Sequence, residues 1–292
     1  MFAGTFTALI TPFREGHLDC DAFQALIERQ IAAGIAGIVP VGTTGESPTL
    51  DSDEHLAVIK AAVEFADGKI KVLAGSGANS TREAIHLTQA AEAMGADASL
   101  QVCPYYNKPS QEGLYQHYKT VAENTGLPIM LYSVPGRSVI EIGIETVARL
   151  ANDCENIVAN KEAGGSVDRV NQLVQAVPED FQILSGDDPL TLPFMSCGAV
   201  GLVSVASNLI PEVMVSLVNR CLEGEYGEAL ELHKRYYPLL SGLMSFDTNP
   251  VPIKSAVALQ GHCTSELRLP LIPLSDEKTE SLRGLLKTYG LL

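Results

Sequence analysis

The residue best suited to covalent chemistry is Lys161, which ends the apolar run Ile157–Asn160 and is soon followed by the pair Gly164-Gly165. A lysine at the inner end of a buried strand has the stem of its side chain inside the protein. Removal from water disfavours the charged ammonium and leaves an amine that can attack a carbonyl carbon and form a Schiff base. We therefore predict that Lys161 is the nucleophile of an imine-forming enzyme.

Residues that could bind a small carboxylate or relay protons follow other apolar runs. The turn Gly42–Glu46 offers backbone N–H groups and the hydroxyls of Thr43 and Thr44, which suit a small carboxylate. Tyr132 ends a run predicted to face the strand of the lysine, where its phenol could relay protons. Arg137 follows a Pro-Gly turn and has the fork of donors that binds a second carboxylate. Each feature alone also fits a plainer role: an ordinary loop, a core tyrosine or a surface arginine.

Neither the cysteines nor the histidines have the spacing of a metal site. The six cysteines are scattered without a C-x-x-C pair, which is typical of reduced thiols in a cytosolic protein, and Cys103 and Cys197 fall in apolar runs that indicate packing. No H-x-x-x-H or H-E-x-x-H arrangement occurs. We predict no metal, nucleotide, flavin or other cofactor. Four histidines fall in predicted helices, where we expect solvated or capping side chains: His55, His86, His117 and His233.

The elements that must position these residues alternate between short apolar runs and amphipathic segments. Eight runs are predicted strands: Thr5–Thr11, Gly37–Val41, Ile70–Ala74, Ala98–Val102, Pro128–Ser133, Ile157–Lys161, Gln182–Ser185 and Gly201–Val205. The predicted helices are Asp21–Ala33, Ser52–Ala66, Thr81–Met94, Gln111–Asn124, Ile144–Ala151, Val167–Ala176, a short one around Pro189–Cys197, and Pro211–Leu222. Start signals precede three of them, at Asp51, Ser80 and Ser110.

Eight strands that each precede a helix predict the α/β class and a (β/α)₈ TIM barrel. A doubly wound sheet is the alternative, but it usually has a phosphate-binding glycine loop after its first strand, and Thr11–Phe13 is not one. After about Gly224 only helices are predicted: Glu225–Ser245, Pro252–Leu259 and Glu277–Thr288. We expect a catalytic barrel domain over 1–223 and a C-terminal helical domain over 224–292 that packs against the barrel or another subunit.

The composition of the chain argues against two classes of partner, nucleic acids and membranes. The chain has 292 residues, 46% of them hydrophobic, and a net charge of −15 without any Lys/Arg cluster. We therefore expect no nucleic-acid partner and no electrostatic attachment to a membrane. The apolar N-terminus Met1–Pro12 lacks a basic segment and is interpreted as a first strand, not a signal peptide, and no run approaches the ~20 apolar residues of a membrane span.

Five segments together resemble the pyruvate-dependent, Schiff-base class I aldolase family that contains dihydrodipicolinate synthases and N-acetylneuraminate lyases. The resemblance covers essentially the whole chain, and the combination of motifs is specific although each motif alone is not. The paired tyrosines of Cys103–Pro109 and the arginine of Pro135–Arg137 are more similar to the synthases, since the lyases lack that arginine. The segments are Ala8–Phe13, Gly42–Glu46, Tyr132–Arg137, Lys161–Ala163 and Arg268–Leu271.

The resemblance implies a cytoplasmic lyase of lysine and diaminopimelate biosynthesis that needs no cofactor. Lys161 would form an imine with pyruvate, and the derived enamine would attack L-aspartate-4-semialdehyde. Tyr132 would transfer protons in a relay with Thr43 and with Tyr106 from a neighbouring subunit, so the family resemblance favours a homotetramer. The substrate-binding residues would be Thr44, Arg137, Gly186 and Val203.

The resemblance also implies inhibition by lysine at a subunit interface. The residues that match such a site are Ser47, His55, Asn79, Glu83 and Tyr105. Pro48 and Ser52 depart from the family pattern there and leave the strength of inhibition open. Near the predicted catalytic residues, the departures Ser133, Ser138 and Asn160 put the choice of aldehyde in doubt. The alternatives are a related aldolase acting on a different 2-keto acid and a catalytically silent keto-acid-binding paralogue.

Overall fold

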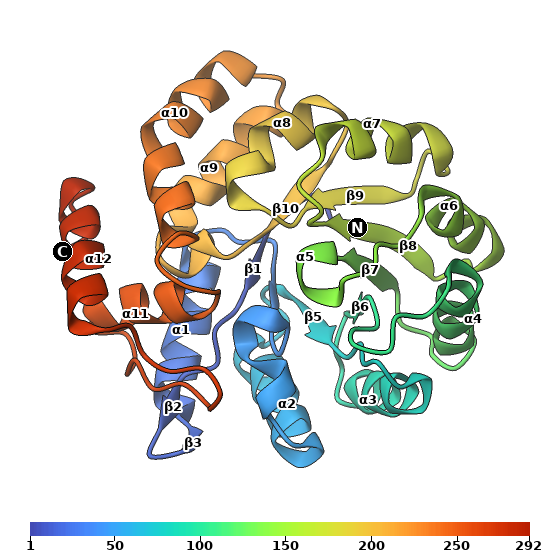
Figure 1. Cartoon of the computed structure of the whole chain (residues 1–292), viewed down its shortest axis with the longest axis horizontal. Coiled ribbons are helices and arrows are strands. Elements are labelled where there is room, and N and C mark those ends of the chain that lie inside the picture. Colours follow the sequence, from blue (N-terminus) through green and yellow to red (C-terminus); the bar gives the residue numbers. More distant parts are fainter.

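Eight parallel strands close into a barrel in the computed structural model, which describes all 292 residues (Figure 1). The first strand, β1, pairs with both β4 and β10 and so closes the sheet. This confirms the TIM barrel over the doubly wound sheet. The strands are β1 (Gly4–Ala8), β4 (Gly37–Val39), β5 (Lys71–Gly75), β6 (Ala98–Val102), β7 (Ile129–Ser133), β8 (Ile157–Glu162), β9 (Gln182–Ser185) and β10 (Gly201–Ser204).

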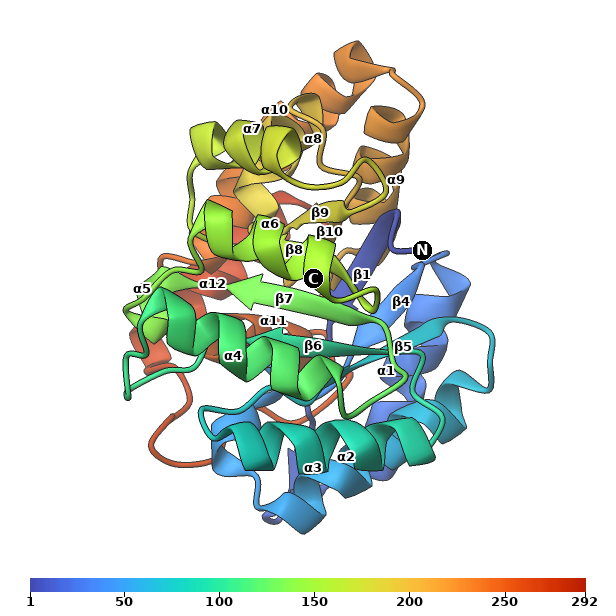
Figure 2. The ribbon, with the colours of Figure 1, turned by 90° about the vertical axis from the view of Figure 1, so that its right-hand side faces the viewer.

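Helices surround the barrel (Figure 2) and begin near most of the predicted residues. The side chains of Asp51 and Ser110 cap helices as predicted, whereas Ser80 makes no side-chain cap bond. The short seventh helix is a 3-10 turn followed by a single short helix. The helices are α1 (Cys20–Ala32), α2 (Ser52–Ala66), α3 (Thr81–Ala93), α4 (Gln111–Ala122), α6 (Ile144–Asp153), α7 (Val167–Ala176), α8 (Thr191–Ser196) and α9 (Pro211–Leu222).

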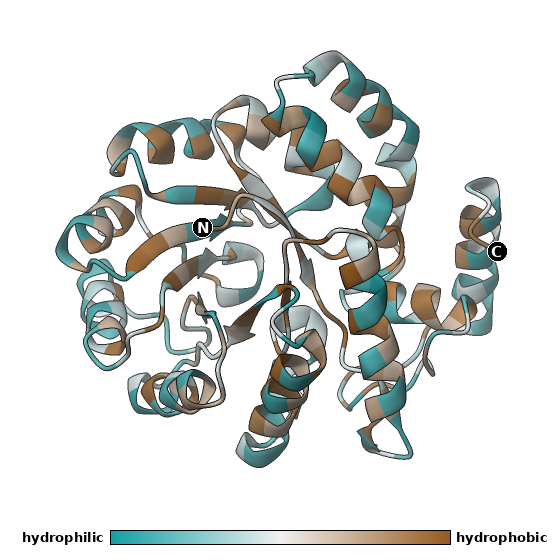
Figure 3. Ribbon diagram, turned by 180° about the vertical axis from the view of Figure 1, so that it is seen from behind, coloured by the Kyte–Doolittle hydropathy of each residue, from teal (hydrophilic) through white to brown (hydrophobic).

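The strands bury both faces, which forms two apolar layers. One layer lies between the strands and the helices, whose outer faces are polar (Figure 3). The other fills the barrel with a side chain from each of the eight strands: Phe6, Val39, Leu73, Leu100, Met130, Ala159, Leu184 and Val203. Because side chains alternate along a strand, residues two positions beyond these also point inward at the carboxyl ends of the strands, where TIM-barrel sites are built.

Three helices follow the barrel: α10 (Tyr226–Leu243), α11 (Val251–Leu259) and α12 (Asp276–Thr288). The first packs against α9 and α8, and α11 packs against α12. The division into domains at 223/224 stays a prediction. A two-stranded hairpin, β2 (Phe13–Arg14) with β3 (His17–Leu18), was not predicted because each strand has only two residues. None of the helices combines the length and apolar character that crossing a membrane requires.

The expectation of solvated or capping histidines is wrong for two of the four. His55 and His117 are buried, whereas His86 is exposed and His233 is half-buried. The His55 Nε2 donates to the carbonyl of Gly75 at 2.8 Å, which joins α2 to the end of β5. Helical periodicity alone could not show which histidines are buried. A histidine in a helix can make a polar contact beneath the helix as readily as it can face solvent.

His117 makes the stability of the fold sensitive to acid. Its Nδ1 lies 2.9 Å from the Oγ1 of Thr81, and burial lowers its pKa from 6.5 to about 4. The unfolded chain therefore binds this proton at a higher pH than the folded chain, and stability is lost as pH falls through that window. The full loss is at most about 3 kcal/mol, from the size of the pKa shift.

We expect His117→Gln to remove much of this acid-side loss, measured by denaturant unfolding at about pH 7 and about pH 4.5. His86→Gln, in which an exposed histidine is replaced, should leave the pH dependence unchanged. An acid-side loss in His117→Gln as large as in the wild type would contradict the assignment.

Candidate active site

Lys161 and Tyr132 lie side by side at the carboxyl ends of β8 and β7. The two residues are direct partners in the parallel register, and both side chains point into the barrel. The Nζ of Lys161 lies 4.1 Å from the centre of the Tyr132 ring. Each side chain is only 5% exposed. The predicted nucleophile and the predicted proton donor are therefore neighbours in a largely dry environment.

No carboxylate neutralises the Lys161 amine. Glu162 follows in sequence, but it points to the opposite face of β8 and pairs with Arg169 at 3.0 Å. The other buried lysine, Lys254, differs, because the Glu46 carboxylate binds its Nζ at 2.6 Å. Burial lowers the pKa of Lys254, and Glu46 opposes that shift. A partnered ammonium is a poor nucleophile, so the geometry favours Lys161 for attack on a carbonyl.

Gly186 and Val203 shape the space around the lysine. A methyl group on Gly186 would lie 2.9 Å from the Cε of Lys161 and 2.8 Å from the Cβ of Ala163. Those distances are too short for real contacts, so only glycine leaves the lysine stem in place. Val203 is fully buried in the cluster inside the barrel. Gly186 therefore adjoins the predicted nucleophile directly, and Val203 belongs to the apolar layer beneath the site.

We expect Gly186→Ala to lower the rate of imine formation, because the new methyl group displaces the Lys161 amine. A displacement of about 1 Å in a reacting group costs on the order of 10²-fold in rate. Borohydride trapping at successive times measures the rate of imine formation. Gly136→Ala is the matched control, since a Cβ there meets nothing within 4 Å. Equal rates in Gly186→Ala and Gly136→Ala would contradict the steric role.

The turn Thr43–Gly45 follows β4 as a single 3-10 turn. The amide groups at the start of such a turn have no partner inside it, which leaves them free for an anion. The buried Thr44 accepts a hydrogen bond at its Oγ1 from the Nδ2 of Asn249 at 2.9 Å, and Thr11 binds the carbonyl of Gly45 at 2.8 Å. This turn is therefore held on both sides in a form that can present N–H and O–H donors.

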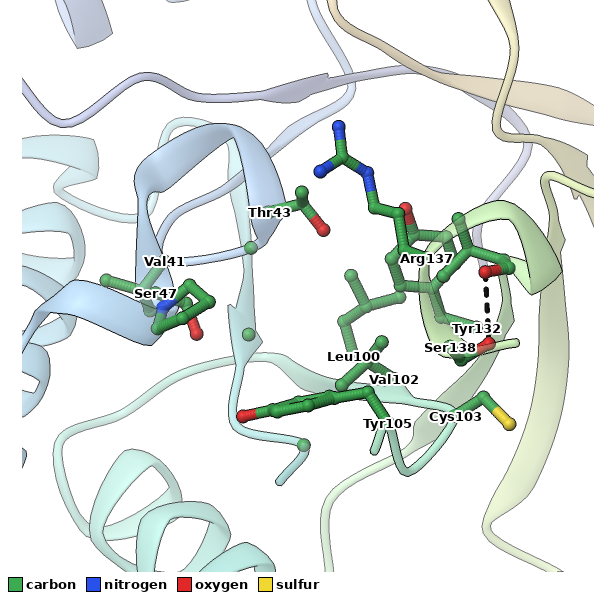
Figure 4. A pocket seen from close by; sticks show the side chains of 15 residues that line it. Val41, Thr43, Ser47, Leu100, Val102, Cys103, Tyr105, Tyr132, Arg137 and Ser138 are labelled. Atoms are coloured by element: carbon green, nitrogen blue, oxygen red, sulfur yellow. Dashed lines mark hydrogen bonds between the residues drawn. The ribbon is translucent and has the colours of Figure 1, made fainter. Parts of the chain in front are cut away.

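A cavity of about 280 Å³ opens between this turn and the ends of β6 and β7 (Figure 4). Thr43 lies on one side, and Tyr132, Arg137 and Ser138 lie on the other. Arg137 belongs to α5 (Pro135–Ser138), and its Nη2 donates to the carbonyl of Asn249 at 2.8 Å. The cavity is mostly apolar with a few convergent polar groups, which is typical of a site for a small metabolite.

Cys103 also lines this cavity but is not a second nucleophile. Its side chain is fully buried, and burial raises the pKa of its thiol to about 11. The thiolate is the reactive form of cysteine, so the packing role predicted for Cys103 is consistent with its surroundings.

Two predicted catalytic residues do not line this cavity: Lys161, which adjoins Tyr132, and Tyr106. Tyr106 is 89% exposed and has a positive φ of 74° in the loop after β6. Its neighbour Tyr105 turns inward instead and lines the cavity. A single chain therefore brings Thr43 and Tyr132 to one cavity but leaves the third predicted member of the relay on its surface.

The residues predicted to bind lysine gather at a second, more polar cavity of about 100 Å³. Ser47, His55, Glu83 and Tyr105 line it, and Asn79 donates from its Nδ2 to the Tyr105 carbonyl at 3.3 Å. Burial lowers the pKa of His55, which favours a neutral ring. Ser47 and Tyr105 line both cavities, so the two sites share walls.

Three polar residues next to the site were not predicted. Asn249 binds Thr44 and Arg137, and Lys254 binds Glu46, which directly follows the Thr43–Gly45 turn. These partners are separated by 112 to 208 residues in sequence. Asp188 is also buried, with a pKa raised to about 6 by burial, and it accepts hydrogen bonds from Ser204 at the end of β10 and from the backbone of the next two residues. No local spacing identifies such contacts, because each depends on how separate elements pack together.

The comparisons with known proteins agree over the full length of the chain. The model of the Dihydrodipicolinate synthetase family matches residues 1–289. The 4-hydroxy-tetrahydrodipicolinate synthase of Endomicrobium trichonymphae is 49% identical over 292 residues, 100% of both chains. The structure of the synthase from Methylacidiphilum fumariolicum SolV is 53% identical, with a TM-score of 0.97 over 100% of this chain and 97% of the other. For the dihydrodipicolinate synthase of Aquifex aeolicus the identity is 48% and the TM-score 0.98, over 99% of each chain. The chain therefore belongs to the dihydrodipicolinate synthetase family.

Proposed function

We propose that the protein is a 4-hydroxy-tetrahydrodipicolinate synthase that condenses pyruvate with L-aspartate-4-semialdehyde through a Schiff base on Lys161. One observation supports this most directly: an unpaired, buried lysine lies 4.1 Å from the ring of Tyr132, beside a cavity with an arginine at its wall. A solved family member from Acinetobacter baumannii is complexed with pyruvate. The activity belongs to lysine and diaminopimelate biosynthesis.

In the proposed reaction the Nζ of Lys161 attacks the keto carbon of pyruvate, and water leaves to give the imine. Loss of a proton from the methyl carbon gives an enamine, and this carbon attacks the aldehyde carbon of the second substrate. The amino group of that substrate then attacks the imine carbon, closes the ring and releases Lys161. Tyr132 gives and takes protons at these steps, since a positioned phenol can do so without a metal.

The two carboxylates bind on opposite sides of the cavity in this proposal. The donors of the Thr43–Gly45 turn, with Thr44, hold the carboxylate of pyruvate. Arg137 holds the carboxylate of the aldehyde, because its guanidinium lines the same cavity and keeps donors free beyond its bond to Asn249. An aldehyde without a carboxylate should therefore react poorly.

We also propose that Tyr106 completes the relay in the cavity of a neighbouring subunit, in a homotetramer. Its 89% exposure and its place on a loop beside the cavity support this, since the side chain is free to enter another subunit and tyrosine is enriched at protein interfaces. Sedimentation analysis of the wild type and of Tyr106→Phe should give the same assembly, with turnover lower in the variant. A fully active monomer would exclude a shared site.

Free lysine is the proposed effector at the second cavity. A solved family member from Cyanidioschyzon merolae, 38% identical to this chain, has lysine bound. The Glu83 carboxylate suits the ammonium of lysine, and the Nδ1 of His55 is left as an acceptor because its Nε2 donates to Gly75. Tyr105 would transmit the effect of lysine binding to the active site, since it lines both cavities.

We expect Glu83→Gln to weaken lysine binding by about tenfold or more, the loss of a hydrogen bond between charged groups, with little change in turnover without lysine. Isothermal titration and inhibition curves measure the two quantities. Glu64→Gln, which removes an exposed carboxylate of α2, is the control. No heat of binding from the wild type at millimolar lysine would refute the effector proposal.

The proposed function is tested by a coupled assay with pyruvate and aspartate semialdehyde, in which added dihydrodipicolinate reductase oxidises NADPH. Turnover supports the synthase. Pyruvate trapping by borohydride without turnover would indicate a related aldolase that uses another aldehyde. The absence of both from folded protein would indicate a catalytically silent paralogue.

A further inference from the structure

Asn249 contacts both carboxylate-binding elements at once. Its Nδ2 donates to the Oγ1 of Thr44 at 2.9 Å, and its backbone carbonyl accepts from the Nη2 of Arg137 at 2.8 Å. The residue is only 7% exposed and lies two residues before helix α11. A residue outside the barrel strands therefore joins the turn after β4 to the arginine after β7.

The bond from Asn249 determines what the Thr44 hydroxyl can do. An amide NH₂ group only donates, so the Thr44 oxygen accepts and its own proton stays free for another acceptor. The Oδ1 of Asn249 is buried without a partner. The reverse orientation of the amide would instead bury an NH₂ group with no acceptor beyond Thr44, and orphaned donors are rarer than orphaned carbonyl oxygens. Thr44 is therefore left with a free proton that it can donate.

A buried ion pair fixes the position of Asn249 relative to the turn. Glu46 directly follows the turn and accepts from the Nζ of Lys254 on α11 at 2.6 Å and from the backbone N–H of Arg268 at 2.9 Å. Lys254 is fully buried, and Glu46 nearly so. Breaking such a pair leaves a buried charge uncompensated, so α11 and the turn are held together strongly.

We propose that Asn249 is a positioning residue that acts through Thr44: it orients the Thr44 hydroxyl as a donor to the carboxylate of the keto acid. This deepens the proposed function and rests on it. The side chain of Asn249 acts on the keto-acid carboxylate through Thr44, whereas its backbone carbonyl binds Arg137. Substitution of the side chain therefore affects one of the two substrates selectively.

The test is borohydride trapping at varied concentrations of pyruvate and of its neutral methyl ester, in wild type, Asn249→Ala, Asn249→Asp and Thr44→Val. We expect Asn249→Ala to raise the half-saturating concentration of pyruvate about tenfold, the loss of one hydrogen bond, and that of the ester less than about twofold. Asn249→Asp keeps the volume but accepts the proton of Thr44, so it should be worse than Asn249→Ala. A space-filling role predicts the opposite order.

A double-mutant cycle tests whether Asn249 acts through Thr44. In the Thr44→Val background, Asn249→Ala should have no further effect on pyruvate, because coupled residues are non-additive. The KM for aspartate semialdehyde should change little in Asn249→Ala, since the backbone carbonyl remains. Asn156→Ala, which removes amide bonds to three distant carbonyls, is the control for lost packing.

Equal losses for pyruvate and its ester, or an undiminished effect of Asn249→Ala in Thr44→Val, would overturn the inference. Wild-type protein that traps no pyruvate would instead refute the proposed function itself. The two failures are therefore distinguishable in the same experiment. Circular dichroism of each variant identifies a loss that comes only from misfolding, and the isosteric Asn249→Asp keeps the inference testable if Asn249→Ala is unstable.

Discussion

Replacing Lys161 with alanine is expected to abolish trapping of pyruvate and to lower turnover by about 10⁴-fold or more, the scale seen when a covalent nucleophile is removed. The reason is geometric as well as chemical. Lys161 is the one lysine beside the Tyr132 ring, it has no carboxylate partner, and Gly186 leaves room for its stem. The coupled assay and mass spectrometry of the borohydride-reduced protein measure the two effects.

Lys254 is the internal control for that experiment. It is as buried as Lys161, but the Glu46 carboxylate at 2.6 Å keeps it as a charged partner. The adduct should therefore be found on the peptide that contains Lys161 and not on the one that contains Lys254. An adduct on Lys254, or full trapping by Lys161→Ala, would refute the assignment of the nucleophile.

The barrel was predictable because its determinants are local. Each strand is a short apolar run and each helix an amphipathic segment, and the carboxyl end of each strand shows its polar residues directly in sequence. Lys161 and Tyr132 could therefore be placed together before the register of β7 and β8 was known. Strand bounds were less certain: β1 ends at Ala8, not Thr11, because the chain leaves the sheet before Pro12.

The contacts of the C-terminal helices could not be predicted. Asn249 and Lys254 lie in or just before a segment whose pattern indicates only a helix, and their partners Thr44 and Glu46 are more than 200 residues earlier. A buried lysine in such a helix resembles any exposed one in sequence. Only the closure of the barrel, followed by the packing of α11 against it, brings these groups to the Thr43–Gly45 turn.

The three residues near Lys161 that depart from the family pattern lie in different surroundings. Asn160 lies on the outer face of β8, where it bonds to Glu162, and Ser133 accepts from the backbone of Ile142. Neither lines the cavity. Ser138 does line it, and its Oγ donates to the backbone carbonyls of Val134 and Ile140. We therefore expect the choice of aldehyde to be more sensitive to Ser138 than to the other two.

Tyr132→Phe is expected to lower turnover by about 10²- to 10⁴-fold, the usual contribution of a positioned acid–base group. The phenyl ring would still pack beside Lys161, so the fold and the binding of pyruvate should survive while proton transfer fails. The predicted signature is a large fall in kcat with a small change in KM. Single-turnover trapping should also slow, because imine formation itself needs proton transfer.

Tyr115→Phe is the matched control for the loss of a tyrosine hydroxyl. Tyr115 donates to the Asp153 carboxylate at 2.7 Å between α4 and α6, away from the cavity. Its substitution should cost about 1 kcal/mol of stability, one hydrogen bond, and leave kcat unchanged. If Tyr132→Phe and Tyr115→Phe turned over equally fast, the phenol of Tyr132 would not be the proton donor.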